Sequence, residues 1–147
     1  MAELSKHWVH GTAVQVEYAD RVKSVRRAGW GTEIVQAPGT DNWVHFPFPT
    51  EVRADAKNWG YVGLHLVATV MDNATIDHVT CHFGVDNSPA RGWKVQLSGG
   101  TIEESFDLQV TGLAEPLVMC VHVVFAGSGD GKIVFHAGGV GYGKLYE

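Results

Sequence analysis

The sequence predicts an all-β fold, a jelly-roll-like antiparallel β-sandwich. Apolar and polar residues alternate with a period of two in one segment after another, which is typical of half-buried strands. Clusters of Gly, Asn, Asp and Pro separate these segments at intervals close to the 8–12 residues of an all-β domain. The chain has 147 residues, 45% hydrophobic and 18% charged. This is enough for one core, and no linker divides it, so we expect a single domain over residues 1–147.

The expected strands follow from the period-two pattern, in chain order. His7, Trp8 and His10 are assigned to a first strand. In Thr12 to Tyr18, Val14 and Val16 point to one side while Gln15 and Glu17 point to the other. The remaining strands are expected at Val22 to Ala28, Gly31 to Gln36, Asn42 to Phe48, Tyr61 to Met71, Ile76 to Phe83, Trp93 to Leu97, Ser105 to Val110, Leu117 to Phe125 and Lys132 to Ala137.

Three of these segments are apolar on both faces, namely Tyr61 to Met71, Ile76 to Phe83 and Leu117 to Phe125. Such strands suit the middle of a sandwich, or a face that a neighbouring subunit covers. The basic residues around Val22 to Ala28 instead indicate an edge strand, where charge discourages pairing with other chains.

The breaks between strands are typical of turns. Gly127 to Lys132 lacks the spacing of a phosphate-binding loop and is interpreted as a hairpin turn. Thr50 to Asn58 is the one segment that fits a helical turn. Because the connection from Pro47 to Gly60 is long, the sequence favours an open sandwich over the alternative, a closed β-barrel.

The net charge and the distribution of apolar residues limit the classes of partner that we expect for the protein. The net charge of −5 argues against general binding of nucleic acid. The first residues lack the apolar region of a secretory signal, and no window reaches the ~20 apolar residues of a membrane helix. We therefore expect a cytoplasmic protein that does not associate with membranes, with leaderless export as the alternative. Cys81 and Cys120 lie in apolar runs and are expected to be buried free thiols rather than a disulfide.

No catalytic residue, metal or cofactor is predicted. A nucleophile elbow is absent, and neither cysteine has a basic neighbour. His78 and His82 share a strand face but stand about 13 Å apart, too far to bind one metal ion. Cys120 and His122 would bind a metal only with His78 or His82 opposite them. We expect these histidines to be hydrogen-bonded across the sheet instead.

Tryptophans beside polar turn residues are the strongest functional signal. An indole ring stacks on the C–H face of a sugar, while amides and carboxylates bind its hydroxyl groups. Trp93 alternates with polar residues and is expected in the core. The predicted ligand-binding residues are Trp30, Asp41, Asn42, Trp43, Asn58 and Trp59.

The chain also resembles a family of small, uncharacterised bacterial proteins. The segments that carry the resemblance are His7 to Tyr18, Arg26 to Thr32, Asp41 to Thr50, Ile76 to Val79 and Trp93 to Ser98. The resemblance implies a compact β-sandwich and assigns no catalytic residue.

Three functions are weighed, and a non-enzymatic module that binds a glycan or another polar small molecule is favoured. The second is a structural or assembly protein that forms a homo-oligomer through the doubly apolar strands. The third is a small enzyme whose pocket is lined by histidines, drawn from His45, His65, His78, His82 and His122.

Overall fold

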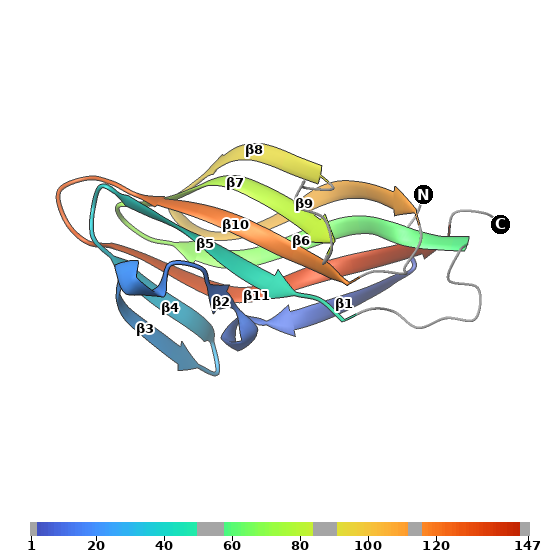
Figure 1. Ribbon diagram of the computed structural model, residues 1–147, viewed down its shortest axis with the longest axis horizontal. Coiled ribbons are helices and arrows are strands. Elements are labelled where there is room, and N and C mark those ends of the chain that lie inside the picture. The colour runs from blue at the N-terminus through green and yellow to red at the C-terminus, as the bar shows by residue number, and fades with distance from the viewer. Residues whose placement is uncertain (1–2, 50–57, 84–90, 112–115, 145–147) are drawn as a thin grey trace.

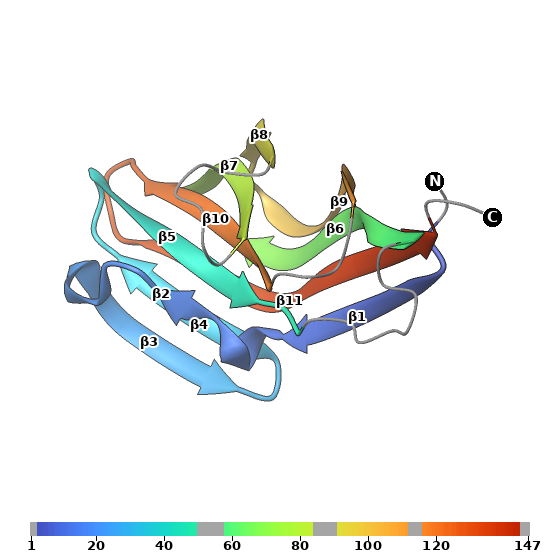
Figure 2. The same ribbon diagram turned by 45° about the vertical axis from the view of Figure 1, so that its right-hand side comes forward.

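The computed structural model describes residues 3–49, 58–83, 91–111 and 116–144. It is a sandwich of two antiparallel sheets, which Figure 1 and Figure 2 show from two directions. The expected jelly-roll-like sandwich is confirmed, and the alternative of a closed barrel is wrong, because the strands form two separate sheets.

The six-stranded sheet has the order β3-β4-β11-β6-β9, with β1 also paired to β11. Along one side of β11, β4 pairs with residues 131–135 and β1 with residues 137–142, so β4 and β1 lie end to end. The other side of β11 pairs with β6. The strands are β1 (Ser5–His10), β3 (Val22–Ala28), β4 (Gly31–Gln36), β6 (Trp59–Val70), β9 (Gly100–Thr111) and β11 (Gly131–Lys144).

The five-stranded sheet has the order β2-β5-β10-β7-β8. Its strands are β2 (Gln15–Val16), β5 (Thr40–Pro47), β7 (Ala74–Phe83), β8 (Arg91–Leu97) and β10 (Leu117–Phe125). Two short 3-10 helices, η1 (Gly11–Ala13) and η2 (Ala19–Arg21), flank β2.

The expected strand from Thr12 to Tyr18 is therefore wrong in length. Side-chain hydrogen bonds hold both of its ends away from the strand ladder. The amide of Thr12 donates to the His10 ring at 3.0 Å, which caps η1. At the other end, the side chain of Asn42 bonds to both the backbone N–H and the carbonyl of Tyr18, each at 3.0 Å.

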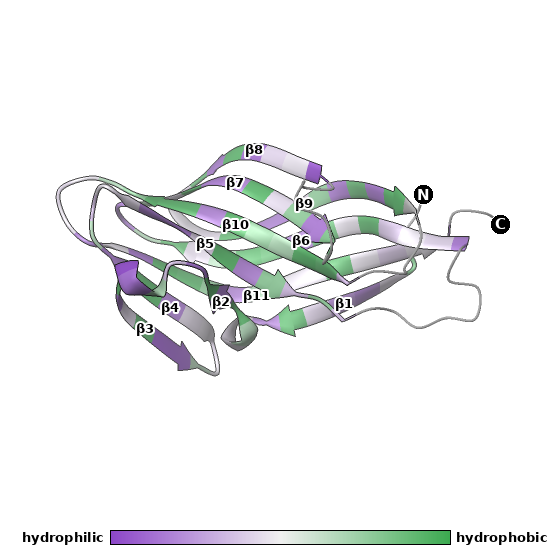
Figure 3. Ribbon diagram, in the orientation of Figure 1, coloured by the Kyte–Doolittle hydropathy of each residue, from purple (hydrophilic) through white to green (hydrophobic). Residues whose placement is uncertain are grey.

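Alternation along the strands places the core between the sheets. In β10, Met119, Val121 and Val123 point inward and are fully buried. Figure 3 shows the corresponding mixture of apolar and polar positions along the strands. The three doubly apolar segments form β6, β7 and β10, each paired on both sides, and β3 lies at a sheet edge as expected.

The remaining expectations have mixed outcomes. Cys81 and Cys120 are buried free thiols, as expected. The hairpin expected at Gly127 to Lys132 is wrong, because this segment connects β10 of one sheet to β11 of the other. The helical turn expected at Thr50 to Asn58 lies outside the described residues except for Asn58. Within the described part of the chain, neither helix is long and apolar enough to cross a membrane.

Candidate functional site

The structure separates the predicted tryptophans. Trp30, in the turn between β3 and β4, is 39% exposed, and its ring lies 5.6 Å from the guanidinium of Arg26. Trp59 begins β6 and is only 8% exposed, with half-buried Asn58 directly before it. Trp43 lies on β5 in the other sheet. The three indoles therefore do not form one surface.

Asp41, Asn42 and Trp43 are consecutive on β5, and the strand alternation divides their roles. Asn42 points inward and is 1% exposed, and its side-chain amide donates to the side-chain oxygen Oε1 of Gln36 at 3.0 Å. It ties β5 to the other sheet and to the turn at Tyr18. Asp41 and Trp43 consequently lie on the outer surface of the five-stranded sheet.

A polar surface surrounds Trp43 on this sheet. Trp43 lies opposite His122 of β10, and His122 lies opposite His78 of β7. One row further along, His45 lies opposite Cys120. We call this surface the Trp43 face; its residues are Asp41, Trp43, His45, Asp77, Cys120 and His122.

His122 is the centre of the Trp43 face. Its Nδ1 lies 2.6 Å from a carboxylate oxygen of Asp77 and its Nε2 lies 2.7 Å from one of Asp41, an arrangement that favours the imidazolium form. Burial opposes protonation, but the hydrogen bonds and charges of Asp41 and Asp77 outweigh it and raise the pKa of His122. The ring also lies against Trp43, with centroids 4.6 Å apart.

Asp41 is held from a second direction by Arg21, whose guanidinium donates to it at 2.9 Å. The hydrogen bond from His122 holds the pKa of Asp41 below its usual value, although desolvation acts against this. The side chains of Asp41 and Asp77 remain 42% and 40% exposed. A glycosidase needs one carboxyl with a raised pKa as general acid, which Asp41 is not. The face is suited to accepting hydrogen bonds from a neutral, hydroxyl-rich ligand.

His45 is the centre of a second group of hydrogen-bonded side chains on the Trp43 face. Its Nε2 donates to Glu17 at 3.0 Å, and its Nδ1 lies 3.1 Å from the Cys120 sulfur. Burial raises the pKa of Cys120 to about 11, so the thiol is protonated at neutral pH and donates to His45. In this protonated form the sulfur is a poor nucleophile.

The described residues hold no group of three or more His, Cys, Asp or Glu side chains arranged to bind a metal ion. Both ring nitrogens of His122 are bonded to carboxylates, and Cys120 is bonded to His45 rather than to His78 or His82. Of the histidines in this sheet, His45 and His122 are thus hydrogen-bonded to neighbouring strands, whereas His82 lies 3.3 Å from the hydroxyl of Thr80 in its own strand.

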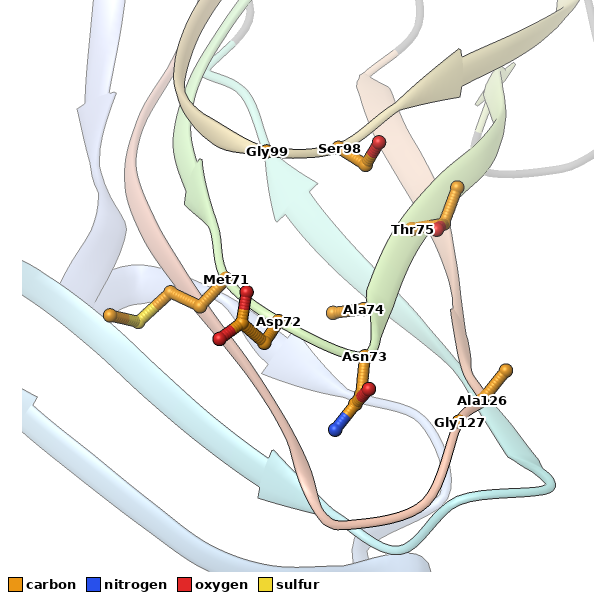
Figure 4. Close-up of a pocket in the computed structure, with 9 residues that line it drawn as sticks. All are labelled: Met71, Asp72, Asn73, Ala74, Thr75, Ser98, Gly99, Ala126 and Gly127. Carbon is orange, nitrogen blue, oxygen red and sulfur yellow. The ribbon is translucent and has the colours of Figure 1, made fainter.

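A separate pocket of about 410 Å³ lies at one end of the sandwich, as Figure 4 shows. It is formed by the turns between β6 and β7 and between β8 and β9, together with the β10–β11 connection. The Asn73 amide that borders it donates to the Gly129 carbonyl at 3.2 Å. Its lining has no aromatic ring: Met71, Asp72, Asn73, Ala74, Thr75, Ser98, Gly99, Ala126 and Gly127. Unlike the Trp43 face, this pocket therefore offers no aromatic platform.

The charge state of His122 can be measured directly. An NMR titration is expected to give His122 a pKa above the ordinary value of 6.5, and D77N is expected to lower it. Because the folded-state pKa is raised, the stabilisation is complete below the unfolded pKa and is lost as pH rises through the folded one. H45Q, which leaves both carboxylates in place, is the matched control. A His122 pKa unchanged by D77N would contradict the arrangement.

The fold is that of carbohydrate-binding modules. The module CBM1 of BiXyn10A superimposes with a TM-score of 0.57 at 13% identity, over 92% of this chain and 95% of that chain. A low-affinity xylan-binding module of Roseburia intestinalis gives 0.54 at 13% identity, over 92% and 94%. A module of a multidomain xylanase from the hindgut metagenome of Trinervitermes trinervoides gives 0.50 at 12% identity, over 93% and 97%.

The chain belongs to a family of unknown function, DUF6623, whose model matches residues 3–131. This confirms the resemblance to a family of uncharacterised β-sandwich proteins. No curated protein matches the chain.

The ligand-binding residues predicted from the sequence do not include Asp77 or His122, although the sequence singles out His122 as a candidate metal ligand beside Cys120 and as a pocket residue of an enzyme. One signal was available for His122, because it is a polar residue in the middle of the apolar run Leu117 to Phe125. Asp77 reaches His122 because the pairing of β7 with β10 shifts register between His122 and Val123, which leaves Asp77 as an extra residue of β7 beside His122. An irregularity of this kind has no clear sequence pattern.

Proposed function

We propose that the protein binds a neutral glycan, without catalysing its cleavage, on the Trp43 face. The observation that carries the proposal is the arrangement of Asp41, Trp43, Asp77 and His122. It supplies an indole ring next to two exposed carboxylates whose charge one imidazolium partly offsets. A sugar requires an apolar platform and adjacent hydrogen-bond acceptors of this kind.

The fold supports the proposal independently of the site. The similar solved structures are carbohydrate-binding modules, one of which is described as binding xylan. At 13% identity the likeness extends to the fold alone. The glycan class therefore rests on the chemistry of the Trp43 face, and a neutral chain suits it because an acidic one would meet Asp41, Asp77 and Glu17.

Replacing Trp43 by alanine tests the site. Calorimetric titration with xylohexaose, cellohexaose and mannohexaose is expected to show binding of at least one of them by the wild type. W43A is expected to weaken binding at this face about tenfold or more, which corresponds to ~1.4 kcal/mol, through loss of the stacking ring.

W30A is the matched control, because Trp30 is also partly exposed but lies in the turn between β3 and β4 of the other sheet. It is expected to leave the affinity unchanged. The proposal fails if none of the three sugars binds, or if W30A weakens binding and W43A does not. Thermal unfolding of both variants checks that the fold is retained.

Assembly into a homo-oligomer stays a prediction. Sedimentation of the wild type at micromolar concentration tests it independently of sugar binding.

A further inference from the structure

The outer surface of the six-stranded sheet carries an exposed indole of its own. Trp8 of β1 is 51% exposed, the most exposed of the tryptophans in the described residues. It lies beside a pocket of about 170 Å³ on the opposite side of the sandwich from the Trp43 face. The pocket is lined by Lys6, Trp8, His65, Leu66, Val67, Glu103, Glu104 and Ser105.

The strand register places the key residues in one row across four strands. Trp8 of β1 lies opposite Gly139 of β11, Gly139 lies opposite His65 of β6, and His65 lies opposite Ser105 of β9. A Cβ atom at Gly139 would come within 2.9 Å of the indole. The absence of a side chain there lets the Trp8 ring lie across β11 toward His65, whose ring centroid is 5.8 Å away.

Hydrogen bonds fix the far side of the row. Ser105 donates to Nδ1 of His65 at 2.8 Å, and Nε2 of His65 donates to Glu3 at 2.8 Å. Glu3 lies over Gly141, where a Cβ atom would come within 1.8 Å of the carboxylate, and also pairs with Lys6 at 3.4 Å. The imidazole is therefore held in place before any ligand arrives, which lowers the entropic cost of binding.

We propose that this Trp8 pocket is a second binding site for a neutral glycan chain, so that one domain holds two chains on opposite faces. The pocket has the volume of about six waters at roughly 30 Å³ each, room for about one sugar ring of a longer chain. Trp8 supplies the stacking surface, while Lys6, Glu103 and Ser105 supply polar groups for hydroxyls. Glu3 and Glu103 outnumber Lys6, so an acidic sugar is disfavoured.

The inference rests on the proposed function for its ligand class but on different residues for its site. The same three hexasaccharides are titrated calorimetrically into the wild type, W8A, W43A and the double variant. The wild type is expected to bind two molecules per chain, each single variant one, and W8A/W43A none. G139A, which displaces the indole without removing it, is expected to weaken the Trp8 site several-fold, and W30A is the control.

The outcomes separate the two proposals. One molecule per wild-type chain, lost in W43A and unchanged in W8A, overturns the Trp8 site and leaves the Trp43 site standing. Binding that is lost in W8A and unchanged in W43A overturns the Trp43 site and leaves the Trp8 site standing. Binding of hexagalacturonate that W8A abolishes would overturn the assignment to neutral sugars. With two sites, the wild type is also expected to crosslink soluble xylan and raise its light scattering, and neither single variant is.

Discussion

The substitution of Gly11 by alanine is expected to destabilise the protein by about 3 kcal/mol or more and to lower its melting temperature by roughly 6–12 °C. Gly11 is buried at the point where β11 exchanges β4 for β1 as its partner. A Cβ atom there would lie 1.8 Å from the carbonyl oxygen of Phe135, a backbone atom of a central strand. The clash cannot be relieved by turning a side chain.

Gly31, the first residue of β4, lies against the same carbonyl group of Phe135. Its Cβ atom would lie 2.1 Å from the Phe135 oxygen, and its φ of +134° is one that residues with a side chain rarely adopt. Thr32 joins the two segments by donating to the Gly11 carbonyl at 2.8 Å. G31A is therefore expected to be at least as destabilising as G11A.

Urea unfolding measures both effects. Gly29 is the matched control, because it lies in the turn that leads into Gly31. It has no unusual φ, and the space around its Cβ position is open. G29A is expected to change the free energy of unfolding by less than about 0.5 kcal/mol. A G11A protein as stable as G29A would show that the packing at Phe135 is looser than the structure has it.

The sequence pattern identified most strands because alternation reports burial directly. Val22–Ala28, Gly31–Gln36 and Leu117–Phe125 have the bounds expected of them. The C-terminal half of β11 was missed, because glycines are weak strand formers and the run from Gly138 to Gly141 reads as a break. Its glycines are explained by tertiary packing, since Gly138 accommodates Phe46 and Gly139 accommodates Trp8.

The candidate site was only partly predictable. Asp41 and Trp43 could be singled out because both belong to one short segment with a recognisable composition. Their partner His122 is 81 residues from Asp41 in sequence and meets it only when β5 and β10 pair. Trp59 also stands beside Asn and Gly in the sequence, yet it is buried. Local composition does not distinguish an indole on the surface from one that fills the core.

Replacing Phe46 by alanine is expected to cost about 3–5 kcal/mol, the range for deleting a fully buried aromatic ring. Phe46 of β5 is fully buried and packs edge-on against Phe135 of β11, with centroids 6.0 Å apart. The ring also occupies the space above Gly138, where a Cβ atom would come within 2.6 Å of it. This contact joins the two sheets, so the loss affects the whole sandwich.

The fit between Phe46 and Gly138 predicts a non-additive pair. G138A alone is expected to cost about 1–3 kcal/mol by displacing the ring. In F46A/G138A the added methyl group enters the space that the ring vacates, so the double variant is expected to be more stable than the sum of the single changes by about 0.5–3 kcal/mol.

Phe125 provides the matched control for this coupling, because it is a buried aromatic residue of β10. Phe46 pairs with Met119 in that strand, so Phe125 stands six residues, about 20 Å, further along. F125A and G138A are therefore expected to add within about 0.5 kcal/mol. Strict additivity of F46A with G138A, measured by the same urea unfolding, would mean that Phe46 does not occupy the space above Gly138. The two sheets would then pack in a different register.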